Sequence, residues 1–274
     1  MEGIERMKNA TLSKEHALYL RKQKQKTVFI NVIRIALLAL LLSVWELAAA
    51  YEWVNPFITS SPSRIAKTIA TLYQSGDLFY HVGTTLWETL AGFAIAVVLG
   101  YSVALLLWWS DVLHKIAEPY IVVLNALPKI ALGPLIIIWF GTGSKAIVFM
   151  TVLIGLIVAI MNMLNGFMAT DENKILLLKS MGANKLQVLT KLVIPSSLPS
   201  FISMLKINVG MAWIGSIMGE YIVSKAGIGY LIVYGGQVFK LDLVMASVFV
   251  LCLLAAGMYA IVALFEKLTV KKTD

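Results

Sequence analysis

The sequence predicts an all-α integral membrane protein with six transmembrane helices. Three observations lead to this prediction: an apolar composition, six apolar stretches long enough to span a bilayer, and basic residues gathered on alternate connections. Of the 274 residues, 59% are hydrophobic and 14% are charged. A water-soluble domain of this length has no interior large enough to bury so much apolar surface.

The charge and the rare residues argue against several other classes of protein. The net charge of +8 resides on segments that flank the apolar stretches, which indicates orientation in a bilayer rather than nucleic-acid binding. Cys252 is the single cysteine, and His16, His81 and His114 are isolated from one another. The sequence therefore predicts neither an internal disulfide nor a metal site.

The first expected span covers residues 28–50 and follows the basic stretch "RKQKQK". A signal peptide is the alternative, but its apolar region would have roughly 7–15 residues. This run is long enough to cross a hydrocarbon core of about 30 Å. We therefore expect an uncleaved first helix, preceded by a basic cytosolic tail of residues 1–27.

The connection after the first span contains a predicted surface helix. Ser63 is placed to cap this helix, Ile65, Ile69 and Leu72 share one of its faces, and it should end near Gly76. We expect it to lie along the outer surface of the membrane.

Five further apolar stretches complete a membrane domain of residues 28–266, followed by a C-terminal tail of residues 267–274. The third of the six spans is the least regular, because its prolines free backbone carbonyls and bend a helix. It could line a pathway or be tolerated for packing. The five stretches cover residues 84–109, 117–140, 145–169, 197–223 and 241–265, and the prolines are Pro119, Pro128 and Pro134.

Lysine and arginine concentrate near both termini and in the connection between the fourth and fifth spans. The positive-inside rule therefore predicts that both termini and this connection, residues 171–195, lie in the cytosol.

The segment 171–195 reads as two short amphipathic helices that meet at Gly182. Acidic residues at the polar start "DENK" suit a helix N-terminus, and Pro195 should end the second helix. Helices this short need a surface on which to bury their apolar faces. Lipid headgroups, the protein's own helices and a partner's groove all remain possible. The two apolar stripes are Ile175, Leu178 and Met181, then Leu186, Leu189 and Val193.

Gly182 is followed by nine residues and then by "LVIP", residues 192–195. This spacing resembles the cytosolic signature of the permease subunits of ABC importers. The stretches "SPSRIAKTIATLYQSGDLFYHVGTTLWETLAGF", "NALPKIALGPLIIIWFGTG" and "LKINVGMAWIGSIMGEYIVSKAGIGYLI" are similar to the nitrate/sulfonate/taurine branch of that family. The resemblance covers roughly residues 60–265.

The resemblance implies a type I ABC importer permease fold in a bacterial cell membrane. It implies two cytosolic ATPase subunits, a second permease copy in a homodimer, and an extracellular or periplasmic solute-binding protein. No cofactor would bind directly, since ATP and Mg belong to the ATPase. The segment that couples to the ATPase would comprise Leu176, Leu177, Leu178, Lys179, Ser180, Met181, Gly182 and Ala183.

Two positions depart from the family pattern. Leu176, Leu177 and Leu178 stand where the signature usually has Glu-Ala-Ala, so docking would depend more on apolar contact. Glu88 stands where relatives commonly have arginine, which leaves its charge partner undefined.

Motifs for nucleotide binding or catalysis are absent from the sequence. No GxxxxGK[ST] loop occurs, and "GTGSKA" at residues 141–146 lacks its spacing and its Gly-Lys pair. Neither a GxSxG elbow nor a paired-carboxylate constellation is recognisable. The sequence therefore predicts a transporter subunit that is not itself an enzyme.

Ionisable residues within spans are costly and indicate functional positions. Lys206 and Glu220 lie about 21 Å apart along one helix, too far to pair within one copy. Interhelical hydrogen bonds or snorkelling are the alternative explanations. The candidates for the translocation pathway or its gate are Asn125, Lys206, Met211, Trp213 and Glu220.

The expected function is import of a small solute, a nitrate/sulfonate/taurine-like anion or a vitamin precursor as the branch implies. The alternative is a self-sufficient secondary transporter or channel. That alternative requires a relay of acids or an inverted repeat, and neither is visible in the sequence.

Overall fold

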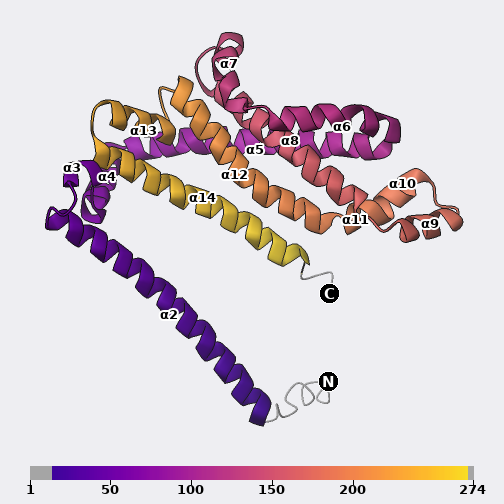
Figure 1. The fold of residues 1–274 in the computed structure, drawn as a ribbon, viewed down its shortest axis with the longest axis horizontal. Helices are drawn as coiled ribbons and strands as arrows, with labels where there is room; N and C mark the ends of the chain where they lie inside the picture. Colours follow the sequence, from indigo (N-terminus) through magenta and orange to yellow (C-terminus); the bar gives the residue numbers. More distant parts are fainter. Residues whose placement is uncertain (1–13, 271–274) are drawn as a thin grey trace. The chain divides into compact units, whose positions relative to one another are not determined.

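The computed structural model describes residues 14–270, and every regular element within them is helical (Figure 1). The chain divides into two units, residues 1–64 and 65–274. The first unit contains the expected first span, and the second contains the other spans and the segment 171–195.

Helix α2 of the first unit runs from Lys14 to Ala50 without a break between the basic stretch and the apolar one. Its part from Arg21 to Ala50 is long and apolar enough to cross a membrane, and its apolar side chains are exposed over most of its length. Such a surface suits contact with lipid tails. The short helix α3, Pro56–Thr59, follows and is capped by the Asn55 side chain.

The expected surface helix exists as α4, Pro62–Ser75, but Ser63 is not its cap. The Ser61 hydroxyl accepts from the Arg64 N–H at 3.5 Å. Pro62 takes the first helical position, because its fixed φ suits that position. The cap is therefore Ser61, the residue before Pro62. The Ser63 N–H and hydroxyl instead donate to the Glu46 carboxylate of α2, at 2.9 and 2.6 Å.

Four expected spans of the second unit are single helices. Like α2, each is long and apolar enough to cross a membrane. The first of them begins seven residues before the expected position 84, at Asp77, where Gly76 in the left-handed conformation stands before the helix. The four helices are α5, Asp77–Trp109; α8, Ser144–Met168; α12, Leu198–Val223; and α14, Leu241–Val270.

The expected span 117–140 is broken into three pieces, which are α6, Asp111–Ala126; the 3₁₀ turn η1, Lys129–Leu132; and α7, Gly133–Phe140. The two parts on either side of the break are bent by 84°. Leu127 is extended because it precedes Pro128, and Pro128 has no N–H to continue the helix. The pair therefore forms a broken span or a re-entrant loop, so the described residues offer five spans, or six if the pair counts as one.

Helix α8 lies between α5 and α12 and forms the centre of the second unit (Figure 1). Small residues allow these three helices to approach closely. A Cβ on Gly92 or on Gly215 would overlap Thr151, and one on Gly100 would overlap Ala159. Close van der Waals packing is the main attraction between helices in a bilayer, because lipid tails are as apolar as the side chains.

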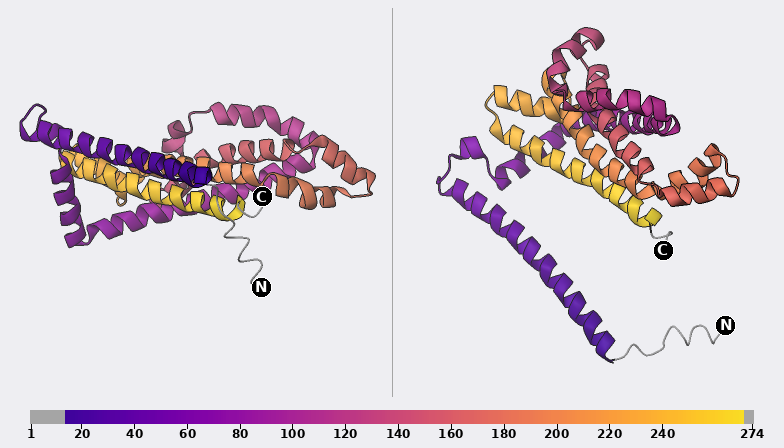
Figure 2. Two further views of the ribbon diagram at one scale, coloured as in Figure 1. Left: turned by 90° about the horizontal axis from the view of Figure 1, so that it is seen from below. Right: turned by 45° about the vertical axis from the view of Figure 1, so that its right-hand side comes forward.

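The remaining helices cover the two ends of this centre. At one end, α13, Ile228–Gln237, packs against α5, α12 and α14. At the opposite end, where α14 also finishes, the segment 171–196 connects α8 to α12 (Figures 1 and 2).

Candidate functional site

The segment 171–196 begins with the helix that its sequence predicts. Helix α9 runs from Glu172 to Ser180, and the Asp171 side chain caps it by accepting from the Asn173 N–H at 2.9 Å. Gly182 has a φ of +85°, a left-handed conformation that favours glycine. The expected junction between two short helices is therefore present at Gly182.

The second half of the segment is longer than the sequence predicts. Helix α10, Lys185–Val188, opens with a capping box in which the Asn184 and Gln187 side chains each bind the other's backbone N–H. It continues through the π turn η2, Leu189–Val193, into α11, Ile194–Ser196. The prediction that Pro195 ends this helix is wrong. Pro195 lies two residues after the π turn, whose altered hydrogen bonding interrupts the regular helix there, and the helix continues to Ser196.

One side of the segment packs against the membrane helices. Val188, Leu189 and Val193 are buried in a cluster with α5 and α8, and Ile175 and Leu178 pack against the same cluster. The protein's own helices therefore provide one of the surfaces that the sequence left open.

The other side of the segment is apolar and has no cover within this chain. Met181, predicted to share the stripe of Ile175 and Leu178, is 76% exposed, and Leu186 is exposed as well. The turn at Gly182 directs Met181 away from the cluster that holds Leu178. The exposed apolar cap of the segment, as we call it below, consists of Leu176, Leu177, Met181 and Leu186.

Lys185 connects this segment to the end of α5. Its Nζ donates to the Trp109 carbonyl oxygen at 2.5 Å and lies 5.9 and 5.3 Å from the ring centroids of Trp108 and Trp109. A cation near the last carbonyls of a helix interacts favourably with its dipole. The segment 171–196 thus contacts α5 directly and continues directly into α12.

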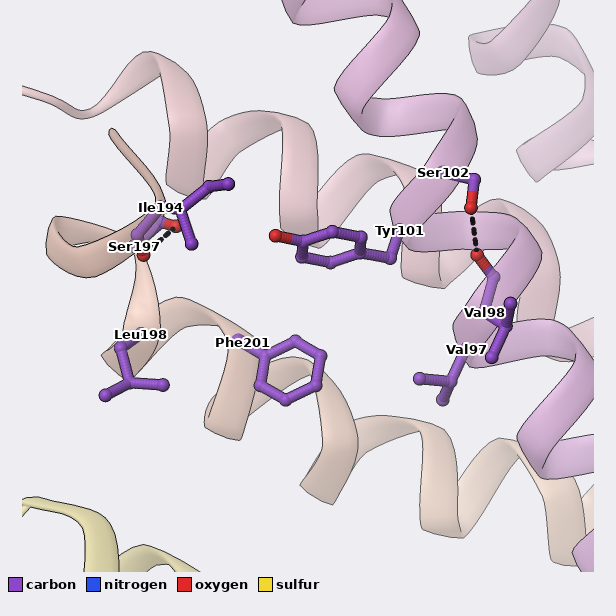
Figure 3. A pocket seen from close by; sticks show the side chains of 8 residues that line it. All are labelled: Val97, Val98, Tyr101, Ser102, Ile194, Ser197, Leu198 and Phe201. Carbon is purple, nitrogen blue, oxygen red and sulfur yellow. Dashed lines mark hydrogen bonds between the residues drawn. The ribbon is translucent and has the colours of Figure 1, made fainter. Parts of the chain in front are cut away.

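Two hollows lie near this end of the second unit, and they differ in chemistry. The first, of about 400 Å³, lies between α5 and the α11–α12 junction and is mainly apolar. Figure 3 shows the Tyr101 ring standing in it between Ile194 and Phe201. The Ser102 hydroxyl is occupied by the Val98 carbonyl oxygen. This hollow therefore offers few partners to a polar solute.

The second hollow, of about 330 Å³, lies between the last turns of α8 and the first turns of α12. Amide and hydroxyl groups supply much of its lining, and neither a lysine nor a carboxylate is part of it. Such groups can donate to and accept from a hydrated solute without binding it tightly. The lining residues are Asn162, Asn165, Gly166, Pro199, Ser200 and Ser203.

The predicted pathway residues do not come together in one place. Lys206 forms an ion pair with Glu266 of α14 at 2.6 Å. Asn125 is exposed on α6, and its carbonyl oxygen accepts from Lys129. Met211 packs beside the cluster that α7 and α8 form, whereas Trp213 is buried in another cluster between α12 and α14. Trp213 is thus in the position expected of a packing residue.

Glu220 lies at the opposite end of α12 and is only 1% exposed. Its Oε2 accepts from the backbone N–H groups of Gly229 and Tyr230, at 2.5 and 3.4 Å. These are the second and third residues of α13, so Glu220 caps a helix from outside it. A Cβ at Gly227, whose φ is +109°, would overlap the Glu220 carboxyl, so glycine is required for this approach.

Helix α5 supplies the rest of this cap, with residues that sequence reasoning did not assign. The His81 Nδ1 accepts from the Gly227 N–H at 2.9 Å, and the Thr85 Oγ1 accepts from the Ile228 N–H at 2.7 Å. Glu88 is also 1% exposed. The spacing of His81, Thr85 and Glu88 puts all three on one face of a helix. Polar residues at that spacing in an apolar helix were the signal in the sequence.

The comparisons with known proteins agree with this architecture. A family model described as binding-protein-dependent transport system inner membrane component matches residues 96–273. The formylaminopyrimidine transport permease protein ThiX of Halalkalibacterium halodurans is 32% identical over 84% of this chain and 91% of its own length. The taurine transport system permease protein TauC of Escherichia coli is 26% identical over 81% of this chain and 83% of its own length.

Solved structures support the same fold. The chain in an inward-facing structure of the MetNI methionine ABC transporter matches with a TM-score of 0.59 at 16% identity, covering 69% of this chain and 95% of that one. A chain of an amino acid ABC transporter crystallised with histidines matches with a TM-score of 0.58 at 17% identity, over 73% and 97%. The type I importer permease fold expected from the sequence is therefore confirmed.

The family is the membrane component of ABC importers, in which a separate subunit hydrolyses ATP and a binding protein delivers the solute. This assignment supports the importer over the self-sufficient transporter or channel. The chain, with its several apolar helices, is therefore a multi-pass membrane protein that belongs to the family of binding-protein-dependent transport system inner membrane components.

Proposed function

We propose that the exposed apolar cap of the segment 171–196 is the surface that receives the ATPase. The observation that carries this proposal is the exposure of four large apolar side chains on a segment whose opposite side is buried. Exposed apolar patches of this kind mark interaction sites. The proposed contact residues are Leu176, Leu177, Leu178, Lys179, Ser180, Met181, Gly182, Ala183 and, in addition, Leu186. Of these, Leu178 and Ala183 also pack against the membrane helices and would contact the ATPase only at the edge of the surface.

ATP binding would move two parts of the permease together through this surface. The hydrogen bond from Lys185 joins the segment to the end of α5, and the helix from Lys185 to Ser196 leads directly into α12. A displacement of the cap therefore reaches both helices that flank α8. Each ATPase subunit would contact one permease copy, and we propose two copies of this chain and two ATPase subunits. ATP and Mg would be held entirely by the ATPase.

The polar hollow between α8 and α12 is the proposed inner part of the translocation path. Its amides and hydroxyls suit a small polar solute, whereas the apolar hollow around Tyr101 does not. The relatives' names cite taurine, aliphatic sulfonates and formylaminopyrimidine. We propose a small sulfonate-type anion or a pyrimidine vitamin precursor as the solute, delivered by an extracellular or periplasmic binding protein.

The proposed orientation places the segment 171–196 and both termini in the cytosol. The basic stretch at the start of α2 and the lysines of the segment support this orientation through the positive-inside rule. On this orientation α13 and the buried carboxyls Glu88 and Glu220 lie near the outer side of the membrane. The domain limits 1–27, 28–266 and 267–274 remain part of this proposal.

Replacement of one exposed leucine by aspartate tests the docking surface. Leu177→Asp should abolish co-purification of the cognate ATPase and ATP-dependent uptake, because a charge replaces an apolar contact. Asn173→Asp places the same charge on the same helix outside the cap and should retain both. Retention of the ATPase by the Leu177 variant would contradict the proposal.

The solute is tested on the cognate binding protein. Taurine, a short alkanesulfonate, nitrate and formylaminopyrimidine are each added, and the melting temperature of the binding protein is measured. A shift with one of the sulfonates or with the pyrimidine supports the proposed class, while a shift with nitrate alone contradicts it. Uptake driven by a proton gradient without the ATPase would favour the channel or secondary transporter.

A further inference from the structure

Glu88 and Glu220 approach each other inside the protein, at the end of the bundle opposite the segment 171–196. Glu88 lies on α5 between Thr85, which accepts from the Ile228 N–H, and Thr89, which donates to the Ser216 hydroxyl. Ser216 lies one turn before Glu220 on α12, so the two carboxyls face each other between these helices, with Ser144 of α8 near Glu88. Glu88 is about 32 Å from Trp109 along α5, at a rise of about 1.5 Å per residue. The contact therefore joins α5, α8 and α12 far from the proposed ATPase surface.

No cation compensates the two carboxyls within the part of the chain that the structure describes. Lys145 of α8 and Lys225 of the α12–α13 connection form no ion pair with either of them. His81 is occupied as an acceptor for Gly227, and the phenol of Tyr221 beside Glu220 carries no positive charge. Tyr230 of α13 contributes its backbone N–H to Glu220. Two ionised carboxylates here would repel each other in a site without solvent.

One oxygen of each carboxyl also lacks a hydrogen-bond partner, namely Glu88 Oε2 and Glu220 Oε1. Unpaired oxygens of buried carboxylates are costly, so most buried polar groups in proteins have a partner. Two carboxylates can only accept, and neither can satisfy the other. A single proton between them changes one into a donor and removes the repulsion at the same time.

The surroundings decide which carboxyl keeps the negative charge. Glu220 accepts from two backbone N–H groups at the N-terminus of α13, and the Thr85 hydroxyl lies within hydrogen-bonding reach of it. The two N–H groups, the hydroxyl and the helix dipole all stabilise an anion there. Glu88 has only the Ser144 side chain besides Glu220. Glu220 is thus the carboxylate and Glu88 the protonated partner.

We propose that Glu88 and Glu220 form a proton-binding site that holds one proton and thereby joins α5 to the α12–α13 corner. The proton comes from the solvent and is carried by Glu88, which donates to Glu220. Loss of this proton leaves two facing anions and loosens the end of α13 from α5. The contact between α5 and the α12–α13 corner should therefore weaken as the pH rises.

Infrared spectroscopy of the full chain in detergent micelles tests the proposal. The wild type at neutral pH should show the carbonyl stretch of a buried, protonated carboxylic acid. Glu88→Gln should remove this band, because the amide supplies the donor and leaves Glu220 ionised. Glu220→Gln should retain the band, because Glu88 is still buried without a cation beside it and therefore stays protonated. Glu118→Gln, at an exposed glutamate of α6, should also retain it.

Four results would overturn the proposal. Absence of the band in the wild type would exclude the shared proton, and its persistence in Glu88→Gln would place the proton elsewhere. Its loss in Glu220→Gln would contradict the assignment of the proton to Glu88. A band that is absent from the wild type together with stabilisation by added sodium or lithium at fixed pH would show a bound metal ion instead.

Thermal unfolding against pH, compared between the wild type and Glu88→Gln, gives a second measurement. An unfolded carboxyl is ionised above pH about 5, so the folded chain binds one more proton than the unfolded chain near neutral pH. Stability then falls as pH rises, and the unfolding constant grows about tenfold per pH unit. Glu88→Gln should lack this part of the slope. Equal slopes in the two proteins would contradict the shared proton.

Discussion

The Nζ atom of Lys185 donates to the carbonyl oxygen of Trp109 at 2.5 Å, so that a residue directly after the Gly182 turn covers the last carbonyls of α5. This contact gives α5 a direct connection to the segment that we propose to bind the ATPase. Without it, the described segment would connect to α5 through packing alone.

Lys185→Ala should lower the free energy of unfolding by about 1 kcal/mol, because it removes a charged group from a helix C-terminus and from two indole faces. In reconstituted complexes it should also raise ATP hydrolysis that is not accompanied by uptake. Lys185→Arg retains the charge and the donors and should keep both properties near wild type. A fully coupled Lys185→Ala complex would show that the contact with Trp109 has no part in transmission.

Gly182→Ala should destabilise the turn by about 1–2 kcal/mol, because its φ of +85° is unfavourable for a residue with a Cβ. Gly83→Ala is the matched control, since Gly83 lies in α5 with no positive φ and a methyl group added there would meet nothing within 4 Å. The control should stay within about 0.5 kcal/mol of wild type. Equal thermal shifts for the two variants would contradict a left-handed conformation at residue 182.

Gly215→Ala should cost about 1–3 kcal/mol, because the added Cβ would lie 2.5 Å from the Thr151 Cα and backbone cannot move aside easily. Gly210→Ala on the same helix meets nothing within 4 Å inside this chain and should unfold like wild type. Thermal unfolding in detergent measures both. A larger effect at Gly210 would indicate that its exposed face is covered by a second copy.

Lys206 and Glu266 should behave as a pair that joins α12 to α14. Their side chains are 25% and 39% exposed, so a coupling energy of about 0.2–1 kcal/mol is expected from a double-mutant cycle. The variants are Lys206→Met, Glu266→Gln and the double variant, measured by thermal unfolding and by uptake. If Lys206 instead contacted the solute, the double variant would transport no better than Lys206→Met.

The sequence was sufficient for five of the six spans, because length and apolarity are local properties of the chain. It also located the turn at Gly182 and the helix start at Asp171, since both depend on a few neighbouring residues. It indicated irregularity at Pro128 without the size of the bend. The 84° angle depends on how α6 and α7 pack against α8, which no local pattern encodes.

The cap of α13 could not be read from the sequence in the same way. His81 and Gly227 are 146 residues apart and meet only after α5 and α12 have packed. Glu88 and Glu220 each looked like an isolated intramembrane charge. Two acids of the same sign give no sequence signal for contact, because ordinary charge pairing would predict the opposite.

The π turn at Leu189–Val193 fixes the rotation of the preceding helix α10 relative to α12. A π turn is an α-helix with one extra residue, and each residue of a helix accounts for about 100° of rotation. Deleting one residue between 189 and 193 would restore a regular helix and turn Leu186 by that angle relative to α12. The exposed apolar cap would then present the same side chains to the proposed ATPase partner from a different direction.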